Sequence, residues 1–362
     1  MPHATIIGAG IAGTATAIGL THVGWHVTLH ERATHPETSG AALGIWPTAL
    51  AALDELGVGE ALRAVATPQA AGSIRRPDGA VLAALSAERV TRRPGDPVHL
   101  IARRDLTEVL AAALPAGAVR YGSRVEPAGE GLDSLAGLEN EAGEPRADVV
   151  VVADGVFSTY RTALLGARYR ARYTGQSGLR GRVAVTTREV TETWGPGRRF
   201  GVTPYLDGTT NWYASLDAPP GQRAAGGEVV LLRELFAGWH DPIGQILEVI
   251  TEDDVMRHDV YDVHPHLPSY VVTGGARNAV LVGDAAHGMT PDLGRGACEA
   301  LVDAVTLARC LASDRVAEGL VRYDSLRRRP TQRLQTLARN VGRIAHARRL
   351  AGARDLLLRA AR

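Results

Sequence analysis

Hydrophobic and polar positions at the start of the chain follow two different periods. The stretches Ala4–Ile7 and His26–His30 fit short buried strands, whereas Ile11–Val23 has the length and spacing of a helix. Glycines occupy the turn between the first strand and this helix. The order strand, helix, strand predicts a βαβ unit and therefore a parallel sheet.

The next segment predicts a helix and then a departure from the parallel sheet. Apolar residues recur at helical spacing over Pro47–Leu56, and Gly57 follows where a glycine commonly ends a helix. Two extended stretches, Ser73–Arg76 and Ala80–Leu85, flank the turn sequence Pro77-Asp78-Gly79. We expect a β-hairpin there, because such a turn suits two adjacent antiparallel strands.

The middle of the chain, between residues 173 and 268, has the pattern of an antiparallel sheet. The alternating segments Arg199–Tyr205 and Thr210–Leu216 surround the turn Asp207-Gly208. Short helical stretches follow at Leu231–Phe236 and Ile243–Ile250. We therefore expect a sheet covered by one or two helices.

On either side of this middle region the pattern returns to buried strands and long helices. A helix is predicted over Asp105–Leu114 and a buried strand over Asp148–Ala153. Ala279–Val282 restores a buried strand, and Gly296–Leu311 and Val316–Arg339 predict long C-terminal helices. A chain of 362 residues exceeds what one core usually supports, so we expect two closely joined domains.

Composition and charge narrow the class of protein. The chain is 45% hydrophobic and 22% charged, and its net charge of +1 gives no reason to expect nucleic acid or a membrane as partner. It contains no lysine, which excludes Schiff-base lysine chemistry. Cys298 and Cys310 form no CxxC pair, which fits a cytoplasmic location. The uncharged stretch Ala4–Leu20 lacks the basic start of a signal peptide. A small-molecule enzyme is the expectation.

The glycine turn has the spacing of a dinucleotide-binding motif. Gly8, Gly10 and Gly13 follow a predicted strand and open a predicted helix, whose free N–H groups suit a pyrophosphate. Glu31 ends the second strand, where a carboxylate can accept hydrogen bonds from ribose hydroxyls. A purely structural glycine turn is the alternative, but the context favours a dinucleotide site.

A second glycine-rich turn follows the strand predicted near residue 280. Gly283-Asp284-Ala285-Ala286-His287 ends this strand, and Pro291, Gly294 and Gly296 precede the long helix that begins near Ala297. An acidic residue at a strand end can bind a polyol, and a helix N-terminus can stabilise negative charge on a ring. An ordinary strand-turn-helix with a capping aspartate is the alternative.

Together these motifs resemble those of the class A flavoprotein monooxygenases, the family of para-hydroxybenzoate hydroxylase. Three patterns match in the family's order: the GxGxxG turn with Glu31, the motif Asp154-Gly155-Val156-Phe157-Ser158-Thr159-Tyr160-Arg161, and Gly283-Asp284-Ala285-Ala286-His287 with Pro291. The resemblance covers essentially the whole chain. It implies an α/β fold, with a Rossmann-like FAD-binding domain of the glutathione reductase type and an inserted, α+β substrate domain built on a β-sheet.

The resemblance also implies domain boundaries and a set of cofactor contacts. The FAD-binding domain is expected to comprise residues 1–71, 98–172 and 271–362, and the substrate domain residues 72–97 and 173–270. Asp284 is expected at the ribityl chain, Pro291 and Gly294–Ala297 along the flavin ring, and Val125 at an adenine-side strand position. Asp154 and Arg161 are candidates for flavin or nicotinamide contacts. The cofactor-binding residues that we predict are Gly8, Gly10, Ala12, Gly13, Glu31, Arg32, Arg103, Val125, Asp154, Asp284, Pro291, Gly294, Arg295, Gly296 and Ala297.

Two positions depart from the family's common Gly-Gln-Gly-x-Asn turn. This chain has Gly294-Arg295-Gly296-Ala297-Cys298. Arg295 either points its guanidinium toward the flavin or lies in solvent. Cys298 is expected to be a small packing residue on the helix rather than a redox partner.

The family's chemistry implies an NADH- or NADPH-dependent hydroxylase. Reduced FAD would react with dioxygen, and a flavin C4a-hydroperoxide would transfer one oxygen atom to an aromatic or polycyclic substrate, in a setting such as secondary metabolism. No side chain is assigned as catalytic and no metal is expected, because His264 and His266 lack a third ligand nearby. His287 is interpreted as part of its motif rather than as a general base. Alternatives are an epoxidase, halogenase or dehydrogenase on the same fold, or an FAD-binding protein that does not hydroxylate.

Substrate contacts are expected from the middle sheet and from the segment that ends at Trp46. Each aromatic residue there could equally belong to the core. The candidates are Trp46, Arg180, Tyr205, Trp212 and Tyr213. The partners expected are a small aromatic substrate and dioxygen, and the protein is expected to be a monomer or homodimer.

Overall fold

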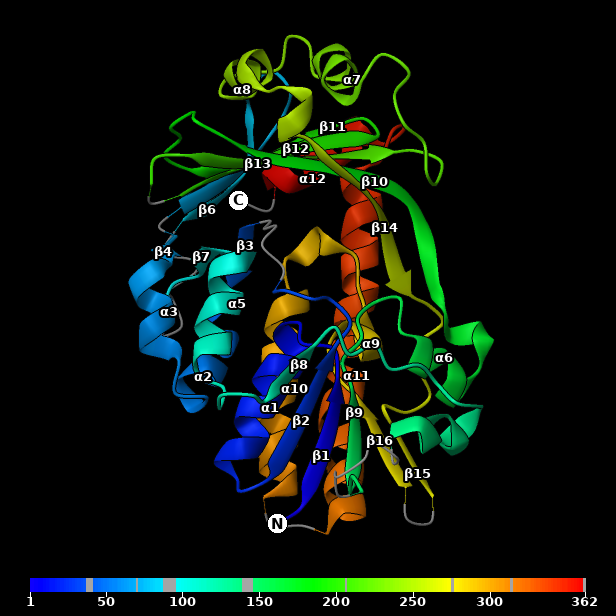
Figure 1. Cartoon of the computed structure of the whole chain (residues 1–362). Helices are drawn as coiled ribbons and strands as arrows, with labels where there is room; N and C mark the ends of the chain where they lie inside the picture. Colours follow the sequence, from blue (N-terminus) through cyan, green and yellow to red (C-terminus); the bar gives the residue numbers. More distant parts are fainter. Residues whose placement is uncertain are drawn as a thin grey trace.

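A computed structural model describes most of the chain (Figure 1). The described residues are 1–36, 42–69, 71–86, 96–138, 146–205, 207–274, 277–312 and 315–360. Residues 87–95 of the predicted substrate segment 72–97 lie outside them.

A six-stranded sheet contains both ends of the nucleotide motif. Its order is β15 (Val271–Gly274), β16 (Arg277–Leu281), β9 (Val149–Val152), β1 (His3–Ile7), β2 (His26–Glu31) and β8 (Val119–Tyr121). Every neighbouring pair is parallel except β15 and β16. The predicted βαβ start and both buried strands are therefore confirmed.

Helices α1 (Ile11–His22), α10 (Gly296–Leu311) and α11 (Val316–Ala345) share a hydrophobic core with this sheet. Helices α2 (Pro47–Glu55), α3 (Gly59–Val65) and α5 (Arg103–Ala112) form a second cluster on the other side of α1. Helix α1 contacts α10, which in turn contacts α2 and α11. All residues from Ile11 to Leu20 are buried, because α1 is enclosed by the sheet and α10. This burial explains why the start of the chain is apolar without being a membrane span.

A small antiparallel sheet lies beside helices α5 and α10. It consists of β3 (Ala42–Ile45), β7 (His99–Ala102) and β4 (Thr67–Pro68), with β7 in the centre. The backbone N–H of Ala42 donates to the side-chain oxygen of Asn211 at 3.4 Å. The segment that leads to Trp46 thus begins at the surface of the third sheet.

The third sheet has seven strands and corresponds to the predicted antiparallel region. Its order is β14 (Met256–Val263), β10 (Ala171–Val183), β13 (Thr210–Asp217), β12 (Arg198–Pro204), β11 (Val190–Gly195), β5 (Ala71–Arg75) and β6 (Val81–Ser86). The predicted hairpin is the pair β5–β6, with Gly79 at a φ of +84° in its turn. Helices α7 (Glu228–Leu235) and α8 (Ile243–Val249) cover one face and share a hydrophobic core with it.

The opposite face of this sheet, which we call the inner face, is turned toward the nucleotide-binding part of the molecule (Figure 1). Strands β10 and β14 extend past the sheet toward α6 (Thr159–Leu165) and α9 (Asp284–His287). A hydrogen bond of 2.9 Å from Val263 N–H to the Gly288 carbonyl fixes this approach.

The C-terminal region contains more helix than the sequence pattern predicts. Helix α11 continues beyond residue 339 to Ala345, and a further helix, α12 (Ala351–Ala360), contacts β6. Short 3₁₀ turns complete the structure: η1 (Gly131–Leu138), η2 (Ala167–Tyr169), η3 (Glu252–Asp254) and η4 (Pro291–Leu293).

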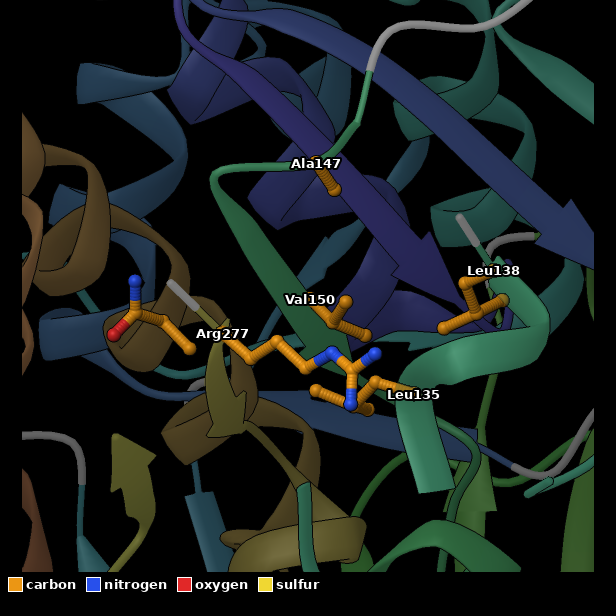
Figure 2. A pocket seen from close by; sticks show the side chains of 6 residues that line it. Leu135, Leu138, Ala147, Val150 and Arg277 are labelled. Atoms are coloured by element: carbon orange, nitrogen blue, oxygen red, sulfur yellow. The ribbon is translucent and has the colours of Figure 1, made fainter. Parts of the chain in front are cut away.

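Two hollows in the described structure lie away from both glycine turns. The first, about 10 Å³, is lined by Leu135, Leu138 and Val150, and Figure 2 shows Arg277 extending across it. The second, about 560 Å³, lies between α12 and the turn of the β5–β6 hairpin. The first has room for roughly one water molecule. Neither hollow is lined by residues of the glycine turns.

Candidate functional site

Three glycines at the junction of β1 and α1 have three different roles. Gly8 has a φ of +99°, and a Cβ there would lie 2.5 Å from the carbonyl oxygen of Ala153. A Cβ on Gly13 would lie 1.9 Å from the carbonyl oxygen of Gly8, so this glycine allows the helix to pack on the turn. A Cβ on Gly10 would have no neighbour within 4 Å. The surface at Gly10 is therefore open for a ligand that approaches the backbone closely.

The N-terminus of α1 provides donors and a positive dipole end beside this open surface. No side chain caps the helix and its first turn contains no acidic residue. Free N–H groups at such an end bind phosphate. Ala12 lies in this first turn, and a Cβ on Gly283 would come within 2.7 Å of the Ala12 methyl group. The two glycine turns therefore meet at this point.

Glu31, at the end of β2, is held against the glycine turn. Its carboxylate accepts hydrogen bonds from the N–H groups of Ala9 and Ala33, each at 2.8 Å. The side chain is half-buried, and the next residue, Arg32, is exposed. A carboxylate fixed at this position can accept further hydrogen bonds from hydroxyl groups of a bound sugar.

Val125 is not at a strand position, so that prediction is wrong. Strand β8 ends at Tyr121, where Gly122 turns the chain with a φ of +70° and donates to the Ala33 carbonyl at 2.8 Å. Val125 lies in the following irregular segment and packs half-buried against the core. Arg103 begins helix α5 and is half-buried.

Asp154 follows β9 and has a carboxylate oxygen without a partner. Its Oδ2 accepts from the N–H groups of Thr159 at 3.1 Å and Tyr160 at 3.4 Å. Its Oδ1 is buried and, among the described residues, accepts no hydrogen bond. Burial raises the pKa of this carboxyl. A buried acceptor without a hydrogen-bond donor destabilises the folded protein, and a ligand that donates to it removes this cost.

Arg161 has a structural position. Its guanidinium is completely buried and donates to the carbonyls of Tyr169 at 2.8 Å, Ala285 at 3.1 Å and Val156 at 2.6 Å. Burial lowers its pKa to about 10. The side chain joins two of the sequence motifs through backbone carbonyls, an arrangement that points to positioning rather than to contact with a flavin or nicotinamide.

Asp284 and the turn around Gly294 form the far end of the candidate site. Asp284 is the exposed first residue of α9, and a Cβ on Gly296 would lie 3.7 Å from its Oδ1. Pro291 is exposed in η4, and Gly294 has a φ of +58°. Gly296 and Ala297 begin α10, whose N-terminus has no side-chain cap. This end therefore presents a carboxylate next to free backbone donors.

A buried ion cluster lies directly behind this turn. Asp303 accepts from the N–H of Gly283 at 2.8 Å and lies 2.6 Å from both Nε2 of His287 and Nε of Arg327. Arg327 also binds the Glu299 carboxylate at 2.7 Å. Burial on its own raises the pKa of Asp303, but His287 and Arg327 lower it to about 2. His287 is completely buried, which agrees with its interpretation as a motif residue.

The two residues that depart from the family's turn both face the β3–α2 segment. The Arg295 side chain does not extend into solvent. It binds Glu299 at 2.7 Å, and its guanidinium carbon lies 5.3 Å from the centre of the Trp46 ring. Cys298 is completely buried against Gly44 and Trp46. Its predicted packing role is confirmed.

The substrate-pocket candidates on the third sheet lie on opposite faces. Trp212 is completely buried, stacks on Phe200 at 5.7 Å between ring centres and belongs to the core beneath α7 and α8. Its assignment to the pocket is therefore wrong. Tyr213, the next residue along β13, faces the other way, and its strand partner on β10 is Arg180. Tyr205 follows β12 and has a buried hydroxyl without a partner among the described residues.

The sequence analysis missed an ion cluster that joins the inner face of the third sheet to the far end of the site. Arg199 on β12 is buried and binds both Glu192, at 2.9 Å, and Asp292 in η4. Tyr213 packs beside it, 5.9 Å from the guanidinium, and a Cβ on Gly201 would overlap its ring. Asp292 stands beside the predicted Pro291, but its partner is ninety-three positions away. They meet because the third sheet lies against the turn that precedes α10, and no local sequence pattern shows this.

The residues fit FAD at both ends of the site. The open surface at Gly10, the fixed carboxylate of Glu31 and the helix N-terminus suit the adenosine diphosphate half. The partnerless oxygen of Asp154 and the exposed Asp284 offer acceptors for the polyol half. Among the described residues no group of three or more His, Cys, Asp or Glu side chains is placed to hold a metal ion. No described helix is both long and apolar enough to span a bilayer.

Comparisons with known proteins agree with this geometry. A family described as "FAD binding domain" matches residues 2–338. The aurachin C monooxygenase/isomerase of Stigmatella aurantiaca is 35% identical over 327 residues, covering 89% of this chain and 84% of that protein. The 3-amino-4-hydroxybenzoate 2-monooxygenase of Streptomyces cremeus is 31% identical over 352 residues, covering 94% of this chain and 87% of that protein.

Solved structures show the same fold. Klebsiella pneumoniae HpxO complexed with FAD and uric acid matches with a TM-score of 0.87 and 25% identity, over 99% of this chain and 93% of that one. A salicylate hydroxylase substrate complex matches with a TM-score of 0.78 and 24% identity, over 99% and 94% of the two chains. This chain therefore belongs to the FAD-binding family of class A flavoprotein monooxygenases.

Proposed function

We propose that this enzyme hydroxylates a flat aromatic or polycyclic small molecule between the flavin and the inner face of the third sheet, with NADH or NADPH as electron donor and dioxygen as co-substrate. The observation that carries the proposal is the ion cluster of Arg199 and Asp292, because it brings the polar inner face directly against the turn that precedes α10. Binding pockets commonly form where two domains meet in this way.

On the flavin side, each residue is proposed for a binding role. Glu31 would bind the adenosine ribose, the α1 N-terminus the pyrophosphate, and Asp154 and Asp284 the ribityl chain. The α10 N-terminus would stabilise negative charge on the flavin ring. When bound, FAD supplies the hydride and oxygen chemistry that no amino-acid side chain provides. The chain's own part is to orient the two reactants and keep water out.

On the substrate side, Tyr213, Arg180 and Tyr205 are proposed to contact the substrate. Burial, and then the Glu192 carboxylate, raise the pKa of Tyr213 well above its usual range, so its hydroxyl stays protonated beside Glu192. Burial raises the pKa of Tyr205 to about 12, so its hydroxyl also stays protonated. The partnerless phenol of Tyr205, the ring of Tyr213 and an arginine suit an aromatic substrate with ring oxygen or carboxylate groups. The relatives named for aminohydroxybenzoate and salicylate point to the same class.

We retain the division into an FAD-binding domain and a substrate domain as part of this proposal. The strands of residues 72–86 and 173–263 all lie in the third sheet, which supports the proposed substrate segments. A cytoplasmic enzyme acting as a monomer or homodimer is also proposed, on the grounds of the two unpaired, buried cysteines and the net charge of +1.

The visible spectrum of the purified protein tests the proposal first. We expect a flavin spectrum that bleaches on addition of NADH or NADPH, faster with one of a panel of phenols, quinones and polycyclic aromatics. Product formed under ¹⁸O₂ should contain one labelled oxygen atom by mass spectrometry. A protein that binds no flavin after reconstitution contradicts the cofactor assignment. Flavin that is reduced but never yields a labelled product contradicts hydroxylation and favours a dehydrogenase or a non-hydroxylating protein.

A further inference from the structure

The turn that begins α10 binds the segment Gly44–Thr48 through side chains that this chain does not share with its family's common pattern. Arg295 donates to the Thr48 hydroxyl at 3.2 Å and covers the Trp46 ring. Cys298 accepts from the Trp46 N–H at 3.5 Å and donates to the Gly44 carbonyl at 3.2 Å. Both departures from the Gly-Gln-Gly-x-Asn pattern thus contact one tryptophan.

Arg295 is itself held in place. Its guanidinium binds Glu299, one helical turn further along α10, at 2.7 Å, and only 20% of its side chain is exposed. Glu299 binds Arg327, which binds Asp303, and Asp303 holds the N–H of Gly283. The arginine is therefore anchored to the Gly283 turn through a continuous buried ion cluster. Its position beside Trp46 is fixed by the same residues that fix the candidate ribityl-binding turn.

Trp46 lies between the two halves of the proposed site. It follows β3, whose first residue, Ala42, contacts Asn211 beside Tyr213 on the inner face. It precedes α2, and its backbone and ring contact the first turn of α10. The indole is half-buried, so part of it remains accessible. A large flat side chain held at this position limits the space between the flavin turn and the third sheet.

We propose that Arg295 and Cys298 are positioning residues that clamp Trp46 as a fixed wall of the substrate space, and that this wall determines the size of ring system the enzyme accepts. The ring-size part rests on the proposed function, whereas the clamp is a property of the protein alone. The cation of Arg295 lies over the indole ring, and the sulfur of Cys298 holds the backbone at Gly44 and Trp46. Removal of the Arg295 guanidinium frees the indole of Trp46 and exposes Cys298, which packs against this segment.

Thiol labelling tests the clamp without reference to catalysis. In a Cys310→Ala background, Cys298 is the only thiol, because the chain has two cysteines. We expect Arg295→Gln, which restores the family's residue, to raise the rate of Cys298 labelling by Ellman's reagent about tenfold. Arg329→Gln, a matched change of an exposed arginine on α11, should leave the rate unchanged. Equal labelling rates in the Arg295→Gln variant and its parent overturn the clamp.

Ring-size preference tests the role of the wall in the FAD-loaded enzyme. The probes are salicylate, 4-hydroxyquinoline and 1-hydroxyanthraquinone, which have one, two and three rings, and binding is read from perturbation of the flavin spectrum. Trp46→Ala should shift the ratio of dissociation constants toward the three-ring probe by at least tenfold, and Trp46→Phe should restore most of the original preference. Arg295→Gln should shift it in the same direction.

Failure of this inference is distinguishable from failure of the proposed function. An unchanged ratio in Trp46→Ala, with all probes still bound, overturns the ring-size role while leaving the hydroxylase proposal intact. If no probe perturbs the flavin of any variant, the proposed substrate class and the ring-size role fall together, and the labelling rates alone decide the clamp.

Discussion

The two ends of the candidate site are built by different means. At the nucleotide end, the shape of the backbone forms the site. Gly8 and Gly13 allow β1 and α1 to pack closely, and Gly10 leaves the surface open. At the inner face of the third sheet, side chains from strands far apart in the sequence make the site. Arg199, Tyr213 and Asp292 come from β12, β13 and η4.

This difference determines how each end responds to substitution. A backbone-built site fails when one methyl group is added, because no side chain can rotate away. A site built from side chains on a strand depends on which face each residue occupies, and neighbours in sequence have opposite functions.

Adjacent residues on β13 should give opposite results. Trp212→Ala removes a completely buried indole from the core beneath α7 and α8 and should lower the free energy of unfolding by about 3–5 kcal/mol. Tyr213→Phe keeps the ring over Gly201 and should cost less than about 1 kcal/mol, while raising KM for the aromatic substrate. Urea unfolding and steady-state kinetics measure the two effects. Loss of substrate binding in a stably folded Trp212→Ala variant would contradict the assignment of the two faces.

Two glycines three positions apart should also separate stability from binding. A Cβ on Gly13 would overlap the Gly8 carbonyl, so Gly13→Ala should destabilise the apoprotein by about 1–3 kcal/mol. Gly10→Ala meets nothing within 4 Å and should leave apoprotein stability nearly unchanged, but its methyl group would stand where the pyrophosphate approaches. FAD titration should then show at least a tenfold loss of affinity. Normal FAD affinity in the Gly10→Ala variant would contradict the assignment of the pyrophosphate to this turn.

The contrast also explains what the sequence could predict. The glycine turns, β1, α1 and the buried strand β9 were predictable because each depends on neighbouring residues and on a regular period. The environment of Trp212 was not, since the sequence does not show which face of β13 the helices α7 and α8 cover. The pair of Arg199 and Asp292 has no local signal at all. Val125 was misplaced because Gly122 ends the pairing of β8 earlier than the resemblance implied.

Glu31 should be needed for its charge more than for its shape. Glu31→Gln keeps one oxygen to accept from Ala9 or Ala33 but loses the second acceptor and the negative charge. We expect FAD affinity to fall about tenfold, equivalent to about 1.4 kcal/mol, with apoprotein stability lowered by about 1 kcal/mol or less. Isothermal titration of the apoprotein with FAD measures the affinity. An unchanged value would count against the ribose role.

Substitution of Asp154 should change stability in the opposite direction. Its buried Oδ1 has no partner among the described residues, and burial raises the pKa of the carboxyl. Asp154→Asn keeps an oxygen for the N–H groups of Thr159 and Tyr160 and removes the buried charge. We therefore expect the apoprotein to gain about 1 kcal/mol at pH 7 while FAD binds more weakly.

The pH dependence of this gain identifies its cause. A folded-state pKa above the unfolded value of about 3.9 means that ionised Asp154 destabilises the apoprotein. Below the unfolded pKa both states are protonated and the penalty is absent; it grows as pH rises and becomes constant above the folded-state pKa. The stability difference between Asp154→Asn and the parent should follow that course in urea unfolding between pH 4 and 8. A stability difference independent of pH would mean that the gain comes from hydrogen bonding rather than from removal of a buried charge. Backbone shape would then be the one established constraint at the nucleotide end.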